Sequence, residues 1–392
     1  MSNEAVVVDV VRTPVCRGKP GGTLSGVHPV DLAAHVLQTV VDRNGLESAQ
    51  IDDVLLGCVS QVGEQAMNIA RQAVLAAGFD ERVPATTIDR QCGSSQQAVH
   101  FAAQGIAAGA YDIVLVGGVE SMSRVPLGSS LAGASPMSPA MRSRYPDGLV
   151  NQGVSAELIA QRWGLSRDDL DAYAAESHRR AAYAWQEGFF DRTVVSVPDA
   201  HDAVTDETVR PGTTAEKLAG LAASFRTEEL AARFPDLDWR ITPGNSSPLT
   251  DGASAALLMS AERAEALGLR PRARFRAFDV IGDDPMLMLT GPIPATRRVL
   301  DRAGLALDEI DAYEVNEAFA SVPLAWATEL GADRARLNPR GGAIALGHAL
   351  GSSGTRLLGT LVDHLEATGG RYGLQTMCEG GGMANALVVE RL

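Results

Sequence analysis

Lysine is nearly absent from this chain, with Lys19 and Lys217 the only two among 392 residues. Arginine supplies the other basic side chains, a bias that we attribute to codon composition. Acidic residues outnumber basic ones and give a net charge of −14, which argues against a nucleic-acid-binding protein. Aromatic residues make up only 5%, but 45% of the residues are hydrophobic, which is enough for a large folded core and excludes general disorder.

Targeting and membrane segments are also lacking. The first twenty residues have no basic segment followed by an apolar run, as a secretory signal would have. No stretch approaches the roughly 18 uninterrupted apolar residues of a membrane helix. The last three residues, Glu390-Arg391-Leu392, differ from a peroxisomal Ser-Lys-Leu ending. We therefore expect a cytoplasmic protein that does not enter a membrane.

Cysteine is scarce and scattered. Cys16, Cys58, Cys92 and Cys378 form no Cys-x-x-Cys pair and have no zinc-ligand spacing, so no metal site is expected. Isolated cysteines in a chain without a secretory signal are usually small buried apolar residues. Each one therefore needs its own argument before it is given a chemical role.

The pattern that is present alternates short β-rich runs with Ala-rich helical stretches. The expected strands are Ala5–Val11, Val54–Val59, Ile113–Gly118, Ala312–Val315 and Ala386–Glu390, and the expected helices include Asp31–Asn44, Asn68–Ala77 and Ser95–Ala108. Such alternation is typical of an α/β fold with buried, largely parallel strands. The stretch Ser95–Ala108 is apolar nearly all round, which places it inside the molecule.

An internal repeat gives the domain organisation. Asp42-Arg43-x-Gly45-Leu46, followed by Ile51-Asp52, recurs 259 positions later as Asp301-Arg302-x-Gly304-Leu305 with Ile310-Asp311. Gly93-Ser94-Ser95 recurs 258 positions later as Gly351-Ser352-Ser353. A common offset predicts a duplicated α/β half whose first copy is interrupted by an insertion.

The insertion, residues 121–244, is richer in charge, proline and aromatic side chains. Ser166 and Asp169 have the spacing of a capping box, which predicts a polar helix running towards Gly188. Several arginines lie in this segment, among them Arg162, Arg179, Arg180, Arg210 and Arg226. These observations fit equally a solvated surface lobe and a lid that receives an anionic ligand.

Cys92 is the first residue with a chemical interpretation. It precedes the buried helix within Asp89-Arg-Gln-Cys92-Gly93, and the positive end of a helix dipole lowers the pKa of a thiol. Gly93 leaves the backbone unobstructed, which suits N–H groups aimed at an oxyanion. At this stage a reactive nucleophile and a buried structural cysteine remain equally supported.

His348 stands in the glycine-rich segment from Gly341 to Gly354, three residues before the second Gly-Ser-Ser. Alone it reads as a loop residue. If the two halves pack with two-fold symmetry, both helix N-termini face one cleft and His348 becomes a plausible base for Cys92. Cys378 begins a run with three glycines and could move protons or simply pack, and a buried Asn316 would need a partner in such a cleft.

Taken in order, these motifs resemble the thiolase family. Cys92-Gly-Ser-Ser, Asn316-Glu-Ala-Phe-Ala, Gly347-His348 and Cys378-x-Gly-Gly-Gly occur in thiolase order. The opening Val11-Arg-Thr-Pro and the segment Gly244-Asn-Ser-Ser247 are also thiolase-like. The resemblance covers essentially the whole chain.

The resemblance implies a duplicated five-layer αβαβα core with an inserted loop domain. Residues 1–120 with 245–268 would form the N-terminal half, 121–244 the loop domain that binds CoA, and 269–392 the C-terminal half. The family needs no permanently bound cofactor and uses coenzyme A as co-substrate. Acyl-CoA and CoA are the expected partners, and the chain would form a homodimer or homotetramer.

The resemblance also implies an activity, the CoA-dependent cleavage of a 3-oxoacyl-CoA through an acyl-Cys92 intermediate. His348 would be the base and Cys378 the acid. Asn316 would hold a water in one oxyanion hole, and the N–H groups of Cys92 and Gly380 would form the other. Ser247 would contact the pantetheine part of CoA.

Two residues depart from the family. Ala349 replaces the proline that usually follows the histidine, which predicts a freer loop, and Glu379 replaces an apolar residue beside Cys378, where a carboxylate would raise the pKa of that thiol. These departures are the only support for one alternative, a weakly active CoA-binding subunit. A second alternative, within the enzyme class, is an acetoacetyl-CoA thiolase working in the condensing direction.

Overall fold

The computed structural model of the chain describes residues 4–198, 200 and 203–392. Its strands are β1 (Ala5–Arg12), β2 (Cys16–Arg17), β3 (Asp53–Gly57), β4 (Ala85–Ile88), β5 (Ile113–Ser121), β6 (Thr250–Ser260), β7 (Ala273–Gly282), β8 (Ala312–Val315), β9 (Tyr372–Glu379) and β10 (Met383–Arg391). They form one sheet in the order β4-β3-β5-β6-β1-β7-β10-β9-β8, with β2 paired to β6. All five strands expected from the sequence are present, as β1, β3, β5, β8 and β10.

Two sets of helices surround this sheet. Those of the core are α1 (Pro29–Arg43), α2 (Ile69–Ala76), α3 (Ser94–Ala107), α9 (Ala261–Ala266), α10 (Pro292–Ala303), α11 (Ser321–Leu330), α12 (Ala343–Leu346) and α13 (Ser353–Thr368). Those of the insertion are α4 (Pro139–Arg144), α5 (Gln152–Arg162), α6 (Arg167–Gln186), α7 (Ala215–Ala219) and α8 (Glu228–Arg233). Within the described residues, no helix has the length and apolar character needed to span a bilayer.

The two sides of the sheet repeat one strand order. The N-terminal half of the sheet has the order β4-β3-β5-β6-β1, and the C-terminal half, counted from its outer edge, has the order β8-β9-β10-β7. In the position that corresponds to β4, the C-terminal half has only a parallel bridge between Leu337 and Tyr313 of β8. The sides join where β1 and β7 pair antiparallel at Val6–Arg274 and Val7–Ala273.

The repeated sequence motif makes the same contacts in both halves. Asp52 Oδ2 accepts hydrogen bonds from the N–H groups of Asp112 and Ile113 at 2.6 and 2.9 Å. Asp311 Oδ2, 259 positions later, accepts them from Arg371 and Tyr372 at 2.6 and 3.0 Å. In each half the aspartate therefore fixes the start of a central strand, β5 or β9.

The expectation of largely parallel strands is wrong. The pairs β3–β4, β3–β5 and β8–β9 are parallel, whereas the six others found among the described residues are antiparallel. In the C-terminal half the reason is local, because Gly380–Gly382 is too short for the crossover that a parallel connection needs.

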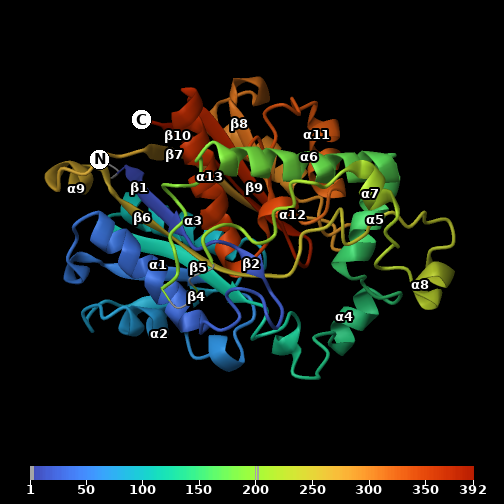
Figure 1. Cartoon of the computed structure of the whole chain (residues 1–392), viewed down its shortest axis with the longest axis horizontal. Helices are drawn as coiled ribbons and strands as arrows, with labels where there is room; N and C mark the ends of the chain where they lie inside the picture. The colour runs from blue at the N-terminus through green and yellow to red at the C-terminus, as the bar shows by residue number, and fades with distance from the viewer. Residues whose placement is uncertain (1–3, 199, 201–202) are drawn as a thin grey trace.

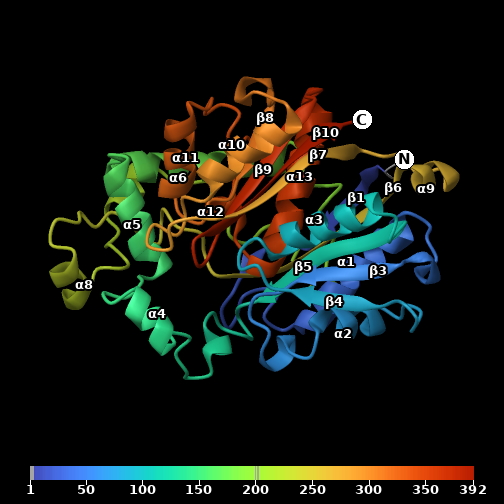
Figure 2. The same ribbon diagram turned by 180° about the vertical axis from the view of Figure 1, so that it is seen from behind.

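Helices and sheet halves alternate as five layers (Figures 1 and 2). Helices α1 and α2 pack on the outer face of the first half, and α10 and α11 on that of the second. Between the halves lie α3 and α13, packed against β1, β5, β6 and β10. The expected buried helix is α3, with ten of its fourteen residues buried. The expected polar helix is α6, which begins at the Ser166 cap with a capping box.

Helices α4, α5, α7 and α8 of the insertion lie at one end of the molecule (Figure 1), away from the end where β10 finishes, whereas Val194 of the insertion bridges Arg12 at the end of β1. Arg179 and Arg180 of α6 both form ion pairs with Glu176, so these arginines are engaged along their own helix. Part of the insertion nevertheless reaches the core, as the site geometry below describes.

The N-termini of α3 and α13 meet at contacts where glycines let the backbones approach closely. A Cβ built on Gly118 would lie 1.9 Å from Gly351 O, and one on Gly354 would lie 2.2 Å from Gln96 N. The Thr355 N–H also donates to Ser95 Oγ at 3.1 Å. This close approach requires glycine and brings the two Gly-Ser-Ser segments together.

We expect Gly118→Ala to destabilise the fold by about 1–3 kcal/mol, because the added methyl must push Gly351 away. Denaturant unfolding measures the loss. Gly282→Ala is the matched control, since a Cβ there meets no atom within 4 Å. Equal stability of the two variants would contradict the rigid contact between the halves.

Candidate active site

Cys92 lies in a tight turn that leads into α3. Gln91 has a left-handed φ of 48°, and its N–H donates to Asp89 Oδ1 at 2.7 Å. Ser94 Oγ accepts from the Arg90 N–H at 2.9 Å and donates to Gln91 O at 2.6 Å. A non-glycine residue in this conformation costs about 1–3 kcal/mol, so the surrounding hydrogen bonds hold the turn in shape.

The Cys92 thiol is buried, and its pKa is opposite in direction to the expectation from the helix dipole. Burial, with a smaller contribution from the Glu379 carboxyl group when that group is ionised, raises the pKa of the Cys92 thiol to about 12. The N–H groups of Cys92 and Gly380 point at the sulfur and lower the pKa, but by less than burial raises it. The prediction of a lowered pKa is therefore wrong for the resting protein, because removal from water outweighs the dipole.

Cys378 lies beside Cys92. It is buried near the end of β9, and burial followed by the charge of Cys92 raises its pKa well above the ordinary value. Cys378 also belongs to the apolar cluster that contains Ala318 and Phe319 of the Asn316 motif. The structure thus brings Cys92, Cys378 and Gly380 to one place.

His348 is buried in the segment between α12 and α13. The residue before it, Gly347, has a positive φ of +80°. Its Nδ1 lies 2.7 Å from Ser353 Oγ, which itself donates to Ala349 O at 2.9 Å. Nδ1 is therefore the protonated nitrogen, and Nε2 is the unprotonated one that can accept a hydrogen bond or a proton. Burial, followed by the charge of Arg356, lowers the pKa of His348 to about 3, so the ring is neutral near pH 7.

Asn316 follows β8 and contacts the other side of the histidine. Its Nδ2 lies 3.3 Å from His348 Nε2, while its buried Oδ1 has no hydrogen-bond partner among the described residues. The Asn316 N–H donates to Thr376 O at 3.1 Å, two residues before Cys378. Asn316 thus connects the histidine loop with the strand that carries Cys378.

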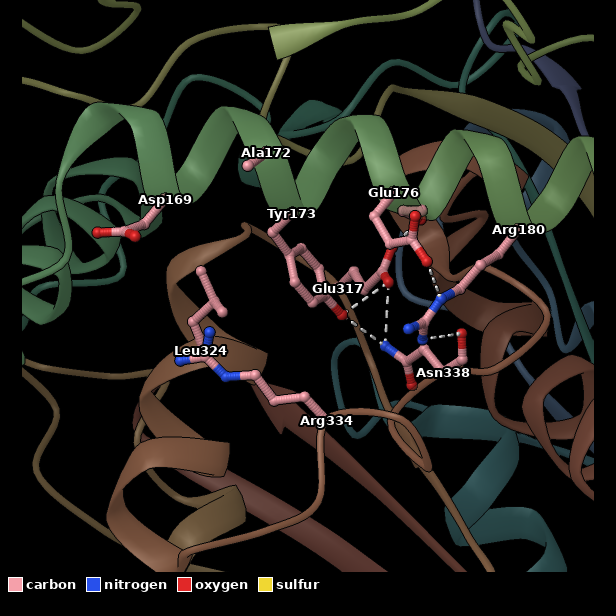
Figure 3. Close-up of a pocket in the computed structure, with 10 residues that line it drawn as sticks. Asp169, Ala172, Tyr173, Glu176, Arg180, Glu317, Leu324, Arg334 and Asn338 are labelled. Carbon is pink, nitrogen blue, oxygen red and sulfur yellow. Dashed lines mark hydrogen bonds and ion pairs between the residues drawn. The ribbon is translucent and has the colours of Figure 1, made fainter.

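Glu317, the next residue of this motif, is occupied by protein partners. Its carboxylate accepts hydrogen bonds from Tyr173 and Ser177 of α6, from Asn338 Nδ2 and from the Ile344 N–H, at 2.7–3.0 Å. Figure 3 shows Tyr173 and Asn338 pointing towards it beneath α6. The cleft in this view, about 190 Å³, is lined by Glu317 and by residues of α6. The hydrogen bonds from Tyr173 and Ser177 to Glu317 fix α6 to the Asn316 motif.

A larger cavity of about 450 Å³ opens on the other side of the motif. It is lined by Met122, Leu127, Asn151, Gln152, Gly153, Ser224, Phe225, Pro243, Ser246, Ser247, Pro248, Leu249, Ala318, Phe319, His348 and Leu350. Ser247 is held there by its Oγ, which donates to Ala318 O at 3.1 Å. The cavity therefore combines the histidine, the Asn316 motif, Ser247 and the insertion.

Sequence reasoning did not identify which residues of the insertion, such as Phe225, line this cavity. The Phe225 ring packs edge-on against Phe319 at 5.9 Å between centroids. Gly153 of α5 makes room for it, since a Cβ on Gly153 would lie 2.3 Å from that ring. An apolar phenylalanine in a charged segment gives no signal of this role.

Ala349 keeps the backbone shape that proline would impose, with φ −70° and ψ 101°. The expected extra freedom of the loop therefore concerns the unfolded chain, and the folded conformation is already compatible with proline.

We expect Ala349→Pro to raise the free energy of unfolding by about 0.4–1 kcal/mol, because proline restricts the unfolded chain. Chemical denaturation measures the gain. Ala345→Pro is the control that should destabilise, since the Ala345 N–H donates to Gly342 O at 3.0 Å. A less stable Ala349→Pro protein would refute the compatibility of this loop with proline.

Comparison with known proteins identifies the family. The model of the thiolase N-terminal domain matches residues 5–262, and that of the thiolase C-terminal domain matches residues 269–391. A steroid 3-ketoacyl-CoA thiolase of Mycobacterium tuberculosis is 47% identical, over 99% of this chain and 94% of that protein. A 3-ketoacyl-CoA thiolase of Aeromonas salmonicida is 42% identical, over 99% of this chain and 100% of that protein.

A solved structure agrees with the fold. The crystal structure of the Bacillus anthracis acetyl-CoA acetyltransferase matches with a TM-score of 0.88 and 37% sequence identity, covering 100% of this chain and 99% of that chain. With both domain models matched along nearly its whole length, the chain belongs to the thiolase family.

Proposed function

We propose that this protein is a thiolase that cleaves a 3-oxoacyl-CoA with free CoA, giving acetyl-CoA and a shortened acyl-CoA. The observation that supports the proposal is that residues of three separate motifs line one cavity. His348, Ser247 and Phe319 line the cavity, and Cys378 packs in the cluster that contains Phe319. The 3-ketoacyl-CoA thiolase names of two relatives support the same reaction.

In the first half of the reaction, Cys92 passes its proton to His348 Nε2 and its sulfur attacks the 3-keto carbon. The bond between C2 and C3 then breaks, and its electron pair leaves with the enolate of acetyl-CoA. Cys378 gives its proton to C2 of that enolate. The products of this half are acetyl-CoA, the acyl-Cys92 thioester and a Cys378 thiolate.

In the second half, the Cys378 thiolate takes the proton of incoming CoA, and the CoA thiolate attacks acyl-Cys92. Cys92 leaves as a thiolate and recovers its proton from His348. A neutral His348 with an unprotonated Nε2 suits this cycle, because it can accept a proton first and return it last.

Two groups of donors stabilise the oxyanions. His348 Nε2 in its protonated form, with a water held by Asn316 Oδ1, serves the tetrahedral intermediate at C3 or the enolate. The N–H groups of Cys92 and Gly380, which both point at the Cys92 sulfur, form the second oxyanion hole. Loss of one such donor costs about 10²–10³ in turnover.

We further propose that residues 121–244 form the loop domain that holds CoA, that Ser247 contacts pantetheine and that no permanent cofactor is bound. Support comes from the insertion's share of the cavity wall, which includes Asn151 and Phe225. Acyl-CoA and CoA would be the only small-molecule partners, and the chain would act in the cytoplasm as a homodimer or homotetramer. Size-exclusion chromatography with light scattering tests the oligomeric state.

The central experiment compares the cleavage of acetoacetyl-CoA, a long-chain 3-oxoacyl-CoA and a polycyclic 3-oxoacyl-CoA. We expect CoA-dependent cleavage of at least one of them, and a loss of roughly 10³-fold or more in Cys92→Ser. The polycyclic substrate is included because one relative is named a steroid thiolase. Activity confined to acetoacetyl-CoA would favour the condensing alternative. No cleavage by folded protein that binds CoA would favour the binding subunit.

A second prediction tests the cavity itself. Gly153→Ala should push the Phe225 ring into the cavity and raise KM for CoA roughly tenfold, through a loss of about 1–2 kcal/mol in binding. Steady-state kinetics at varied CoA measures the change. Gly220→Ala, where a Cβ meets no atom within 4 Å, is the control in the same segment. An unchanged KM would show that CoA enters by another route.

A further inference from the structure

Glu379, the last residue of β9, has its whole side chain in the interior, with 0% of its surface exposed. Its carboxyl group lies against Gly93, the residue after Cys92: a Cβ built on Gly93 would be 2.0 Å from Glu379 Oε1. The missing side chain of Gly93 therefore makes the space that this carboxyl group fills.

Neither Glu379 oxygen has a hydrogen-bond partner among the described residues. The Asn385 amide of β10 also borders Gly93, but its Nδ2 donates to Gly93 O at 3.0 Å, and its own Oδ1 is unpartnered. A buried carboxylate without hydrogen bonds is far more costly than a buried neutral acid.

The charged and titratable groups around Glu379 do not neutralise it. Arg90 and Asp89 of the turn act on it in opposite directions, and no ion pair joins it to Arg90 in the described residues. His100 of α3 is neutral near pH 7, because burial lowers its pKa to about 3. Burial raises the pKa of Glu379 to about 9. The thiols Cys92 and Cys378 also lie close to Glu379.

We propose that Glu379, packed against the turn that carries Cys92, is kept as the uncharged acid while the enzyme works. This inference rests on the proposed thiolase function. The neutral carboxyl group packs the turn that carries Cys92 and adds no negative charge when the thiol gives up its proton. If the Glu379 carboxyl group ionises, its negative charge raises the pKa of the neighbouring Cys92 thiol and disfavours the thiolate.

The consequence is a specific alkaline loss of activity. Glu379 is not among the residues that line the cavity, so its charge affects ionisation of Cys92 and not binding of CoA. Between pH 8 and pH 10 the wild-type kcat should fall about tenfold while KM stays constant, since one pKa unit on the nucleophile is a factor of ten.

Glu379→Gln, which keeps the shape without the charge, tests the inference beside wild type and the control Glu366→Gln. Glu366 forms an ion pair with Arg272, remote from the Cys92 turn. Glu379→Gln should match the wild-type kcat at pH 7 and keep it at pH 10, whereas Glu366→Gln should decline like wild type. Glu379→Leu should behave like Glu379→Gln and serves as the second variant if the first does not fold.

Alkylation of Cys92 by iodoacetamide, followed by mass spectrometry, gives a readout that needs no thiolase activity. Glu379→Gln should react like wild type at pH 7 and about tenfold faster at pH 10. Faster alkylation of the variant already at pH 7 would mean that Glu379 is charged at rest, and equal rates at every pH would mean no coupling; either overturns the inference. Failure of the proposed function alone would instead abolish cleavage and leave the alkylation difference intact.

Discussion

The direct packing of the α3 and α13 N-termini is the contact on which the site depends. Gly118, Gly351 and Gly354 leave backbone against backbone there, so neither helix can shift without moving the other. Glu120 secures the junction, accepting hydrogen bonds at 3.0 Å from the N–H groups of Val59, Ser60 and Gly351. Cys92 precedes one helix and His348 the other, so this junction fixes where both side chains can lie.

Much of this architecture could be predicted from the sequence, because it follows from local pattern or from repetition. The 259-residue offset connects Asp52 with Asp311, and both make the same pair of hydrogen bonds. The buried α3 followed from its apolar residues on all sides, and α6 from its capping box. Strand direction could not be predicted, since it depends on which distant strands pair.

The site divides in the same way. Cys92, His348, Asn316 and Cys378 stand in recognisable motifs, whereas Phe225 reaches the cavity only through the packing of α5 against the core. The pKa of Cys92 was predicted in the wrong direction because the helix dipole is a local property and burial is a tertiary one. Glu379 was recognised as unusual, but its effect on Cys92 depends on a side-chain direction that sequence does not contain.

The buried, protonated Cys92 has a consequence for the protein's durability. Peroxides oxidise thiolates, and they do so fastest at exposed cysteines of low pKa. Cys92, which is 3% exposed and whose thiol has a pKa of about 12, is protected on both counts. The burial that disfavours ionisation of the Cys92 thiol therefore also shields it from oxidative inactivation between turnovers.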